Sequence, residues 1–455
     1  MSGRKNSVGM LGTDDLFPWV EEAGGGKVVE AKLAAGGNRC VGWSVDLQKR
    51  DGQITPLFLR YQTFEDAGGG PYTVRREAEA YAALRDKPVC IPRLVAVHPR
   101  YQAMLTERAA GTADYRGLED LKEKAALARQ CVEALAELHA VVASTLDIPS
   151  FGGHRTIDEA VRGEIKTWYA MYLDSGRTDP LIEFGRIWLE DNRPAVSAPA
   201  VLVHGDAGPG NFMFESGRLS ALIDWELAHL GDPMEDLAWF SLRSVLEPAP
   251  DFPARVREYE AASGSPVNLD RIRFHRVFVS WRIVIIRHCN VSGRAGASVI
   301  SRALNRRLLI EAIDAVEGSS AASVEKLDVP PREYDGLFEQ VLNDIRTVIV
   351  PGCDNNKDAI LKAKDVAKAV KFMRQLYSIG PEVERWELSE LARLLGEAPA
   401  TLASGRAALS AKIRELAIDI REAHLFFRQS AAFETQLASG SMGALATRHF
   451  PPLTN

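Results

Sequence analysis

The first quarter of the chain alternates between short apolar runs and glycine-containing turns. Apolar and β-branched residues recur at about every second position, a spacing that predicts strands. Five runs have this character: Lys27–Leu33, Val41–Leu47, Ile54–Tyr61, Leu94–Val97 and Ala103–Glu107. Val74–Leu84 instead has apolar residues at helical spacing. We therefore expect an antiparallel sheet of about five strands with one helix.

Beyond Gly111 the apolar spacing becomes that of helices. The longer helical runs are Leu118–Val142, Asp158–Leu173, Pro180–Asp191 and much of Pro233–Val316. Three short strand-like runs interrupt them: Val201–Val203, Phe212–Phe214 and Leu219–Ile223. After a stretch rich in serine, alanine and proline, Glu333–Gly443 has leucines and alanines spaced for packing in a helix bundle.

These patterns predict an α+β protein with several parts. We expect an N-terminal extension at residues 1–24, a sheet lobe at 25–108 and a helical lobe at 109–317. A linker at 318–332 would then lead to an all-α domain at 333–455. A chain of 455 residues is long enough for two or three such domains.

Composition restricts the partners of the chain. A net charge of -6 argues against general affinity for nucleic acid or for anionic membranes. The five cysteines are scattered and odd in number, which favours reduced thiols and a cytoplasmic location. Val277–Ile286 is interrupted by Arg282 and is too short to span a bilayer, which takes roughly 20 apolar residues. We expect a soluble protein with no nucleic-acid partner and no membrane segment.

The residues that carry chemistry lie between Val201 and Phe240. A strand ends at His204, a loop presents Asp206, and Asn211 follows at the spacing D-x-x-x-x-N; Asp224 ends the next hairpin. Phosphoryl transfer needs a carboxylate beside the attacking hydroxyl and hard oxygen ligands for Mg²⁺. Asp206 fits the first role, and Asn211 with Asp224 fits the second. Each motif taken alone is more often an ordinary loop or strand end.

This stretch resembles the aminoglycoside phosphotransferase and choline kinase family, whose signature is H-G-D-x-x-x-x-N followed by a strand and I-D-W. The resemblance implies a bilobal protein-kinase-like fold, ATP and Mg²⁺ as cofactors, Asp206 as catalytic base and Asn211 with Asp224 as metal ligands. It also implies structural roles for His204 and His139, and a helix-capping or supporting role for Asp232 and Asp236. The Leu-Arg strand and the Ile-Asp-Trp-Glu hairpin look closest to kinase-like domains associated with acyl-CoA dehydrogenases, here with an additional C-terminal helical domain.

Further residues are candidates for nucleotide binding. The turn formed by Gly36, Gly37 and Asn38 could cover ATP phosphates with its backbone N–H groups, or it could simply be a tight turn. Arg60 stands where most kinases carry a phosphate-binding lysine; the alternative is an exposed strand arginine. Glu77 is the best candidate to pair with Arg60, and Glu79 competes with it.

The end of the fifth predicted strand resembles a kinase hinge. Main-chain groups at Glu107 and Arg108 would there bind adenine. Trp281 and Arg282 lie on an apolar and basic helix that either lines an acceptor pocket or is packed in the core. Lysines interleave with acids between residues 357 and 371, which is typical of a solvated face.

The sequence therefore predicts an ATP-dependent phosphotransferase that acts on a hydroxyl group of a small molecule. The acceptor stays open among a hydroxyacyl thioester, another hydroxylated metabolite and an amino sugar. The alternative is a non-catalytic, pseudokinase-like nucleotide-binding module that acts through its C-terminal helices, for which Arg60 is the main support. Homodimerisation through the C-terminal helical domain is a further expectation.

Overall fold

The computed structural model describes residues 12–34, 40–62, 71–153, 156–289, 295–318 and 324–454. The chain forms two compact units. Unit 1 comprises Met1–Val161, Val196–Asn268 and Pro451–Asn455, and unit 2 comprises Arg162–Ala195 and Leu269–Phe450. The backbone therefore passes from one unit to the other four times.

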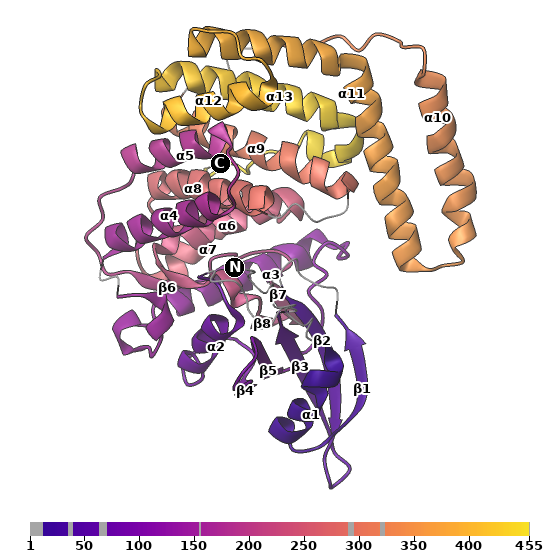
Figure 1. The fold of residues 1–455 in the computed structure, drawn as a ribbon. Coiled ribbons are helices and arrows are strands. Elements are labelled where there is room, and N and C mark those ends of the chain that lie inside the picture. Colours follow the sequence, from indigo (N-terminus) through magenta and orange to yellow (C-terminus); the bar gives the residue numbers. More distant parts are fainter. Residues whose placement is uncertain are drawn as a thin grey trace, which may run out of the picture. The chain divides into compact units, whose positions relative to one another are not determined.

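Unit 1 contains a five-stranded antiparallel sheet (Figure 1). Its strands are β1 (Lys27–Leu33), β2 (Val41–Gln48), β3 (Ile54–Tyr61), β4 (Leu94–Val97) and β5 (Ala103–Glu107), in the order β1-β2-β3-β5-β4. Arg60 on the central strand β3 pairs with Gly42 on β2 and with Met104 on β5. The predicted sheet is confirmed, and so is the predicted α+β class of a sheet followed by helices.

The first helix, α1 (Thr13–Gly24), was not predicted from the apolar pattern. Its Leu16 and Val20 are fully buried and pack with Val45, Leu57 and Leu105 of the sheet. Residues 13–24 are therefore part of the core of unit 1, with Leu16 and Val20 four positions apart on one helix face. The short helix was hidden by Pro18 within it and by the glycines that follow.

Two further helices belong to this part of unit 1, α2 (Val74–Ala83) between β3 and β4 and α3 (Leu121–His139) after β5. Thr73 caps α2 by accepting a hydrogen bond from the backbone N–H of Arg76, and Asp120 caps α3 in the same way through Lys122. The apolar face of α3 is buried over Leu127, Cys131 and Leu135, among other residues. Both helices lie where their spacing predicted them, with ends shifted by one to three residues.

Short strands and turns bracket the loops that carry the candidate site. They are β6 (Val201–Val203), β7 (Phe212–Glu215), β8 (Arg218–Leu222), the single turn η3 (Trp225–Leu227) and β9 (His229–Gly231). β6 pairs with β9, and β7 pairs with β8, both antiparallel. Helices α6 (Pro233–Leu246) and α7 (Phe252–Ser263) then complete unit 1, together with the single turns η1 (Ala143–Thr145) and η2 (Pro149–Phe151).

Unit 2 is helical in the part that the structure describes. Its helices are most of α4 (Ile157–Asp174), and α5 (Pro180–Asp191), α8 (Leu269–Cys289), α9 (Ala295–Glu317), α10 (Asp335–Asp344), α11 (Lys357–Leu395), α12 (Leu402–Arg414) and α13 (Ile420–Met442). Trp281 is fully buried and donates to the carbonyl of Ile182 at 2.9 Å. Of the two alternatives for α8, the packed helix is the one found.

The C-terminal helices share a core with α5. Phe184 of α5 packs against Phe427 of α13, with ring centroids 5.2 Å apart. The buried carboxylate of Glu183 pairs with Arg414 of α12. Helices α12 and α13 therefore belong to the same packed unit as α5.

A long helical hairpin completes unit 2 (Figure 1). α10 continues into a turn of π-helix, η4 (Ile345–Ile349), and the single turn η5 (Pro351–Cys353) leads into the first half of α11. A last single turn, η6 (Gly443–Ala446), follows α13. Over the described ranges of the chain, no helix has the length and apolar character needed to cross a membrane.

Candidate active site

The loop that follows β6 is fixed by its own backbone and by α6. Gly205 has φ +79°, and a Cβ there would lie 2.1 Å from the carbonyl oxygen of Leu227, so only glycine fits. The buried carboxylate of Asp236 on α6 accepts hydrogen bonds from the backbone N–H groups of His204 at 2.7 Å and Gly205 at 2.9 Å. His139 on α3 contacts the same carboxylate through Nε2 at 3.0 Å. The sharp turn before Asp206 is thus held by α6 through Asp236, and α3 supports Asp236 through His139.

His204 connects this loop to the end of the β7–β8 hairpin. Its Nε2 lies 2.9 Å from the carbonyl oxygen of Ile223, and its Nδ1 accepts from the backbone N–H of Asp206 at 3.3 Å. A neutral ring protonated at Nε2 satisfies both contacts. The ring also packs against Trp225, with centroids 4.8 Å apart. This is the structural role that the family resemblance implied for His204.

Asp206 and Asn211 face each other across the loop. The amide nitrogen of Asn211 donates to the backbone oxygen and to Oδ2 of Asp206, both at 2.8 Å. The backbone of Asn211 accepts from the N–H of Ile223 at 3.0 Å, next to Asp224. The side chain of Asp206 is 17% exposed, so it is reachable from solvent. The loop therefore presents one carboxylate and one amide as a fixed pair.

Arg243 on α6 joins both of these groups. Its Nη1 donates to the two carboxylate oxygens of Asp206 at 2.8 and 2.9 Å, and its Nη2 donates to Oδ1 of Asn211 at 2.8 Å. Its Nε donates to the carbonyl of Pro209 at 2.8 Å, which holds the guanidinium plane in place. Such charge-assisted contacts are stronger than neutral ones. A guanidinium thus occupies the oxygen of Asn211 that a metal ion would use.

Opposing effects act on the pKa of Asp206. Burial raises the pKa of Asp206, the positive charge of Arg243 opposes this rise, and the negative charge of Asp224 adds to it. The net result is a pKa above the ordinary aspartate value. The mutual effect of the two acids means that Asp206 and Asp224 lie in one electrostatic neighbourhood. A raised pKa makes Asp206 a better proton acceptor than an unperturbed aspartate.

Asp224 follows β8 in a left-handed backbone conformation, with φ 68° and ψ 60°. This conformation is uncommon for a residue other than glycine and is tolerated best by aspartate and asparagine. Strained positions of this kind occur often at functional sites. Burial alone would raise the pKa of Asp224, but the guanidinium groups of Arg60 and Arg243 outweigh it and lower the pKa, so this carboxylate stays ionised.

Arg60 is surrounded by three carboxylates. Its Nη2 donates to Oδ1 of Asp224 at 2.8 Å and to Oε2 of Glu226 at 2.7 Å. Its Nε lies 3.0 Å from Oε2 of Glu77 on α2. Glu79 instead accepts hydrogen bonds from the backbone and hydroxyl of Ser150. The pairing of Arg60 with Glu77 rather than Glu79 is therefore confirmed, and Arg60 is not an exposed strand arginine.

One guanidinium does not neutralise three acids. Burial raises the pKa of Glu77 to about 8, against the opposing charge of Arg60 and with the support of Asp224 and Glu226. The side chains of Asp224 and Glu226 remain 33% and 29% exposed. The solvent-facing part of the cluster therefore keeps surplus negative charge, which suits a further cation.

The oxygen atoms present fit Mg²⁺, which binds proteins through one or two carboxylates and completes its shell with waters and phosphates. Asp224 and the amide oxygen of Asn211 could serve as hard ligands, and Arg243 would then have to release that amide oxygen. Within residues 12–454, apart from the undescribed gaps, no group of three or more histidine, cysteine or acidic side chains could hold a metal by itself. Such a cage is not needed where the nucleotide supplies the remaining oxygens.

The remaining candidates for nucleotide binding are the glycine-rich turn and the predicted hinge. Gly36, Gly37 and Asn38 lie outside the described residues. The N–H of Glu107 donates to the carbonyl of Arg93 at 2.8 Å, and that of Arg108 donates to Pro56 at 3.1 Å. Because both N–H groups are already used, an adenine contact at these two residues would fall to their carbonyl oxygens.

Sequence reasoning missed Arg243 and gave no role to Glu226. A signal for Arg243 was present: it lies seven residues, or about two helical turns, after Asp236 and so shares its helix face. Asp232, by contrast, has its expected capping role, since its Oδ1 accepts from the N–H of Met234 at 2.9 Å.

Comparison with known proteins finds similarity over part of the chain. Residues 56–275 match the model of a family described as phosphotransferase enzyme family. A segment of 126 residues is 32% identical to acyl-CoA dehydrogenase family member 11 of Homo sapiens and covers 26% of this chain. A segment of 191 residues is 27% identical to a probable acyl-CoA dehydrogenase of Arabidopsis thaliana and covers 35% of this chain. The chain matches only 15% of the length of the human relative and 23% of the plant one.

Solved structures of aminoglycoside phosphotransferases are also similar. A thermostable mutant of APH(4)-Ia in a ternary complex with ADP and hygromycin B is 17% identical, with a TM-score of 0.44, and the match covers 68% of this chain and 99% of that one. A streptomycin-ATP-APH(2")-IIa ternary complex is 18% identical, with a TM-score of 0.45, and the match covers 62% and 95%.

Proposed function

We propose that this chain transfers the γ-phosphate of ATP to a hydroxyl group of a small molecule, in keeping with the match of residues 56–275 to the phosphotransferase enzyme family. The observation that carries the proposal is the cluster of Asp206, Asn211 and Asp224. Arg243 and Arg60 hold its side chains by hydrogen bonds, and Asp236 holds the backbone of Gly205 beside Asp206. Two acids and one amide with these supports are the groups that phosphoryl transfer requires.

Asp206 is the proposed catalytic base. Its carboxylate accepts the proton of the acceptor hydroxyl while the hydroxyl oxygen forms its new bond to phosphorus and the bond to the ADP oxygen breaks. Asn211 orients this carboxylate through the 2.8 Å contact to Oδ2. Burial favours the reaction, since it raises the pKa of Asp206 and so strengthens the base.

Asp224 and Asn211 are the proposed ligands of Mg²⁺, and Arg60 stands beside the phosphates. Mg²⁺ bound with ATP would neutralise the charge that develops on the transferred group. Arg60 keeps Asp224 in place through the 2.8 Å bond and has a planar fork that suits phosphate oxygens. Glu77 in turn fixes Arg60 from α2.

The names of two relatives support an order in which acceptors should be assayed. The curated relatives are named for acyl-CoA dehydrogenation, and the matched segment is a small part of each. We therefore propose hydroxyacyl thioesters as the first acceptors to assay, ahead of other hydroxylated metabolites and amino sugars. Five free cysteines are in keeping with a cytoplasmic location, which stays a prediction.

The experiment is ATP turnover with a library of hydroxyl compounds, in wild type and in Asp206→Asn. We expect transfer in the wild type and a loss of about 100-fold or more in the variant, since general-base catalysis contributes that much. ATP binding and the melting temperature should change little. A matched control is Asp251→Asn, which removes the charge from an acid at the start of α7 in unit 1. Transfer that survives Asp206→Asn undiminished would refute the assignment.

One observation favours a second function, a nucleotide-binding module without catalysis. Arg243 engages both oxygens of Asp206 and the amide oxygen of Asn211, which leaves the loop without a free catalytic pair in this state. If that state persisted with nucleotide bound, the chain would bind ATP but transfer nothing. The same assay separates the two functions, because a binding module shows nucleotide affinity with no turnover for any acceptor.

A further inference from the structure

The α10–α11 hairpin of unit 2 exposes an unusual number of large apolar side chains. Leu337 is 57% exposed, Val341 37%, Val366 46% and Met373 48%. Others of the same kind on the hairpin are Tyr334, Val348, Ile349, Leu361, Leu376 and Tyr377. Monomeric soluble proteins rarely expose a contiguous apolar patch of this size, and larger patches usually mark interaction sites.

The core inside the hairpin is small and uses other residues. Ile345 packs with Ala363 and Val370, and Phe338, Leu342 and Ala367 lie against them. With 3.6 residues per turn, Leu337 and Val341 are rotated roughly 80° from this inward face of α10. Val366 and Met373 are rotated by about the same angle, in the same sense, from the inward face of α11.

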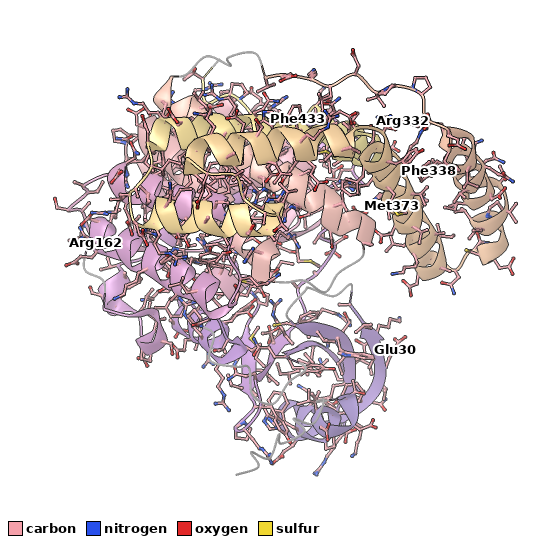
Figure 2. The ribbon with its side chains drawn as sticks, turned by 45° about the horizontal axis from the view of Figure 1, so that its top comes forward. Glu30, Arg162, Arg332, Phe338, Met373 and Phe433 are labelled. Atoms are coloured by element: carbon pink, nitrogen blue, oxygen red, sulfur yellow. The ribbon has the colours of Figure 1, made fainter. Side chains whose placement is uncertain are left out.

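These rotations place the exposed residues on one side of the hairpin. The two helices are antiparallel. Residues rotated in the same sense from the inward face of each helix therefore lie on the same side of the hairpin. Leu337, Val341, Val366 and Met373 form this face, which we call the hairpin face. Figure 2 labels Met373 on α11 and the inward-facing Phe338 on α10.

The other sides of the hairpin already have partners or charges. On the far side of α11, Asp365 accepts from the backbone N–H of Ala297 on α9 at 2.9 Å, and the carbonyl of Lys368 accepts from Ser441 of α13. On the edge opposite the hairpin face, Arg374 pairs with Asp335, and the exposed Lys364 points the same way by helical position. The hairpin face takes part in none of these contacts, and its apolar side chains are exposed.

We propose that the hairpin face binds the same face of a second copy of this chain. A standard interface buries about 800 Å² on each partner, of which roughly 500 Å² is apolar. Tyr334 lies three positions before Leu337, and Leu376 and Tyr377 lie three and four positions after Met373, so these three residues extend the hairpin face along the two helices. The seven partly exposed side chains together supply apolar area of that order. The area available is therefore what a stable dimer needs.

The form of the face also suits self-association. A two-fold axis normal to it would bring two helices of each copy together as four packed helices, a common and stable arrangement. Its borders carry both signs of charge, with Asp344 exposed on α10 and Lys362 exposed on α11. Two copies therefore do not meet with like-charged rims.

The test is the molar mass of the full chain in solution, measured by light scattering and by sedimentation from micromolar to submillimolar concentrations. We expect a dimer in the wild type and a monomer, or a loss of affinity of at least tenfold, in Val366→Asp and Met373→Asp. Lys364→Asp is the matched control, since it introduces an aspartate on the same helix but on the edge opposite the hairpin face. This variant should remain dimeric.

Folding is checked by the melting temperature extrapolated to low protein concentration, which should agree between the three variants, because all three positions are exposed. A monomeric wild type over the whole concentration range overturns the proposal, even if the chain then binds vesicles or another protein through this face. A dimer that persists in Val366→Asp and Met373→Asp together also overturns it, since the contact would then lie elsewhere.

Discussion

Arg243 decides how the candidate base behaves. It is the only residue among those described that contacts Asp206 and Asn211 with a full positive charge. By stabilising the ionised carboxylate it holds down a pKa that burial would otherwise raise further. In the proposed mechanism the same guanidinium would compete with a metal ion for the amide oxygen of Asn211. Arg243 would then link the protonation of the base to the binding of the cation.

The first prediction concerns Arg243→Gln. Without the guanidinium the pKa of Asp206 rises further, so the base becomes protonated at a higher pH. We expect the acidic limb of the profile of kcat/KM against pH to move to higher pH, with the alkaline limb unchanged. The pH–rate profile of both proteins measures this.

Arg116→Gln is the control for that profile, because Arg116 is exposed and donates to the carbonyl of Leu246 at 3.1 Å, away from Asp206 in the sequence and in its contacts. An acidic limb that stays in place, or moves to lower pH, in Arg243→Gln would show that Arg243 does not act on the base.

The second prediction concerns Arg60→Met. The side chain of Arg60 is only 15% exposed and pairs with Glu77, Asp224 and Glu226. Removing one member of a buried ion cluster leaves uncompensated charge and costs about 3–5 kcal/mol. Because the acids left behind are protonated at lower pH, the loss should be smaller at pH 5 than at pH 8. Urea unfolding at the two pH values measures it.

Arg108→Met is the comparison for Arg60. Arg108 pairs with Asp46 on the same sheet, but its side chain is 35% exposed. Surface pairs of this kind contribute about 1 kcal/mol or less. Equal losses in the two variants would mean that Arg60 is not the centre of a buried cluster.

At the scale of elements, the apolar periodicity predicted the strands of the sheet and the long helices. It missed two short elements, α1 and β9, which depend on contacts with distant parts of the chain. Each strand of the sheet is a short run rich in apolar residues between turns, so its limits could be predicted within a residue or so. Helix α1 has only two fully buried apolar positions, Leu16 and Val20, and contains Pro18. β9 is three residues long and exists through its pairing with β6. Neither has enough local pattern to stand out.

The third prediction tests whether α1 belongs to the core. Leu16 is fully buried against the sheet, so Leu16→Ala should lower the free energy of unfolding by about 2–5 kcal/mol. Glu22→Ala on the exposed side of the same helix should change it by less than about 0.5 kcal/mol. Denaturant unfolding of both variants measures the difference. A negligible effect of Leu16→Ala would mean that α1 is detached in solution.

At the scale of the whole molecule, the C-terminal helices are packed into a unit that also contains earlier helices. Phe184 of α5 contacts Phe427 of α13, and Glu183 is buried beneath Arg414 of α12. Arg428 of α13 pairs with Asp314 of α9. Residues on both sides of the expected linker thus share one core.

The fourth prediction follows for a chain truncated at residue 332. Removal of α11–α13 would uncover the apolar contacts of Phe184 and leave Glu183 without its arginine, a buried charge unpaired. We expect the truncated chain to bind a hydrophobic dye, to aggregate and to lose its cooperative unfolding transition. Deletion of 324–356, which spares these contacts, is the comparison and should be better tolerated. A truncated chain that unfolds cooperatively at the wild-type temperature would contradict this.

The candidate site was predictable to the extent that it rests on local motifs. The spacing from His204 to Asn211 and the Ile-Asp-Trp-Glu segment are contiguous in sequence, so Asp206, Asn211 and Asp224 could be singled out. The contacts of Arg60 with Asp224 and of Asp236 with Gly205 span 164 and 31 residues. Partners at such separations are chosen by the folded arrangement, which a single sequence does not encode in any short pattern.

Helix α6 carries both Asp236, which holds the backbone of the catalytic loop, and Arg243, which holds its side chains. One helix therefore holds the loop at two points. A substitution that displaces α6 by a fraction of an ångström would move the loop with it. Inherited variation in activity should therefore concentrate in the residues that pack against this helix, away from the reacting atoms.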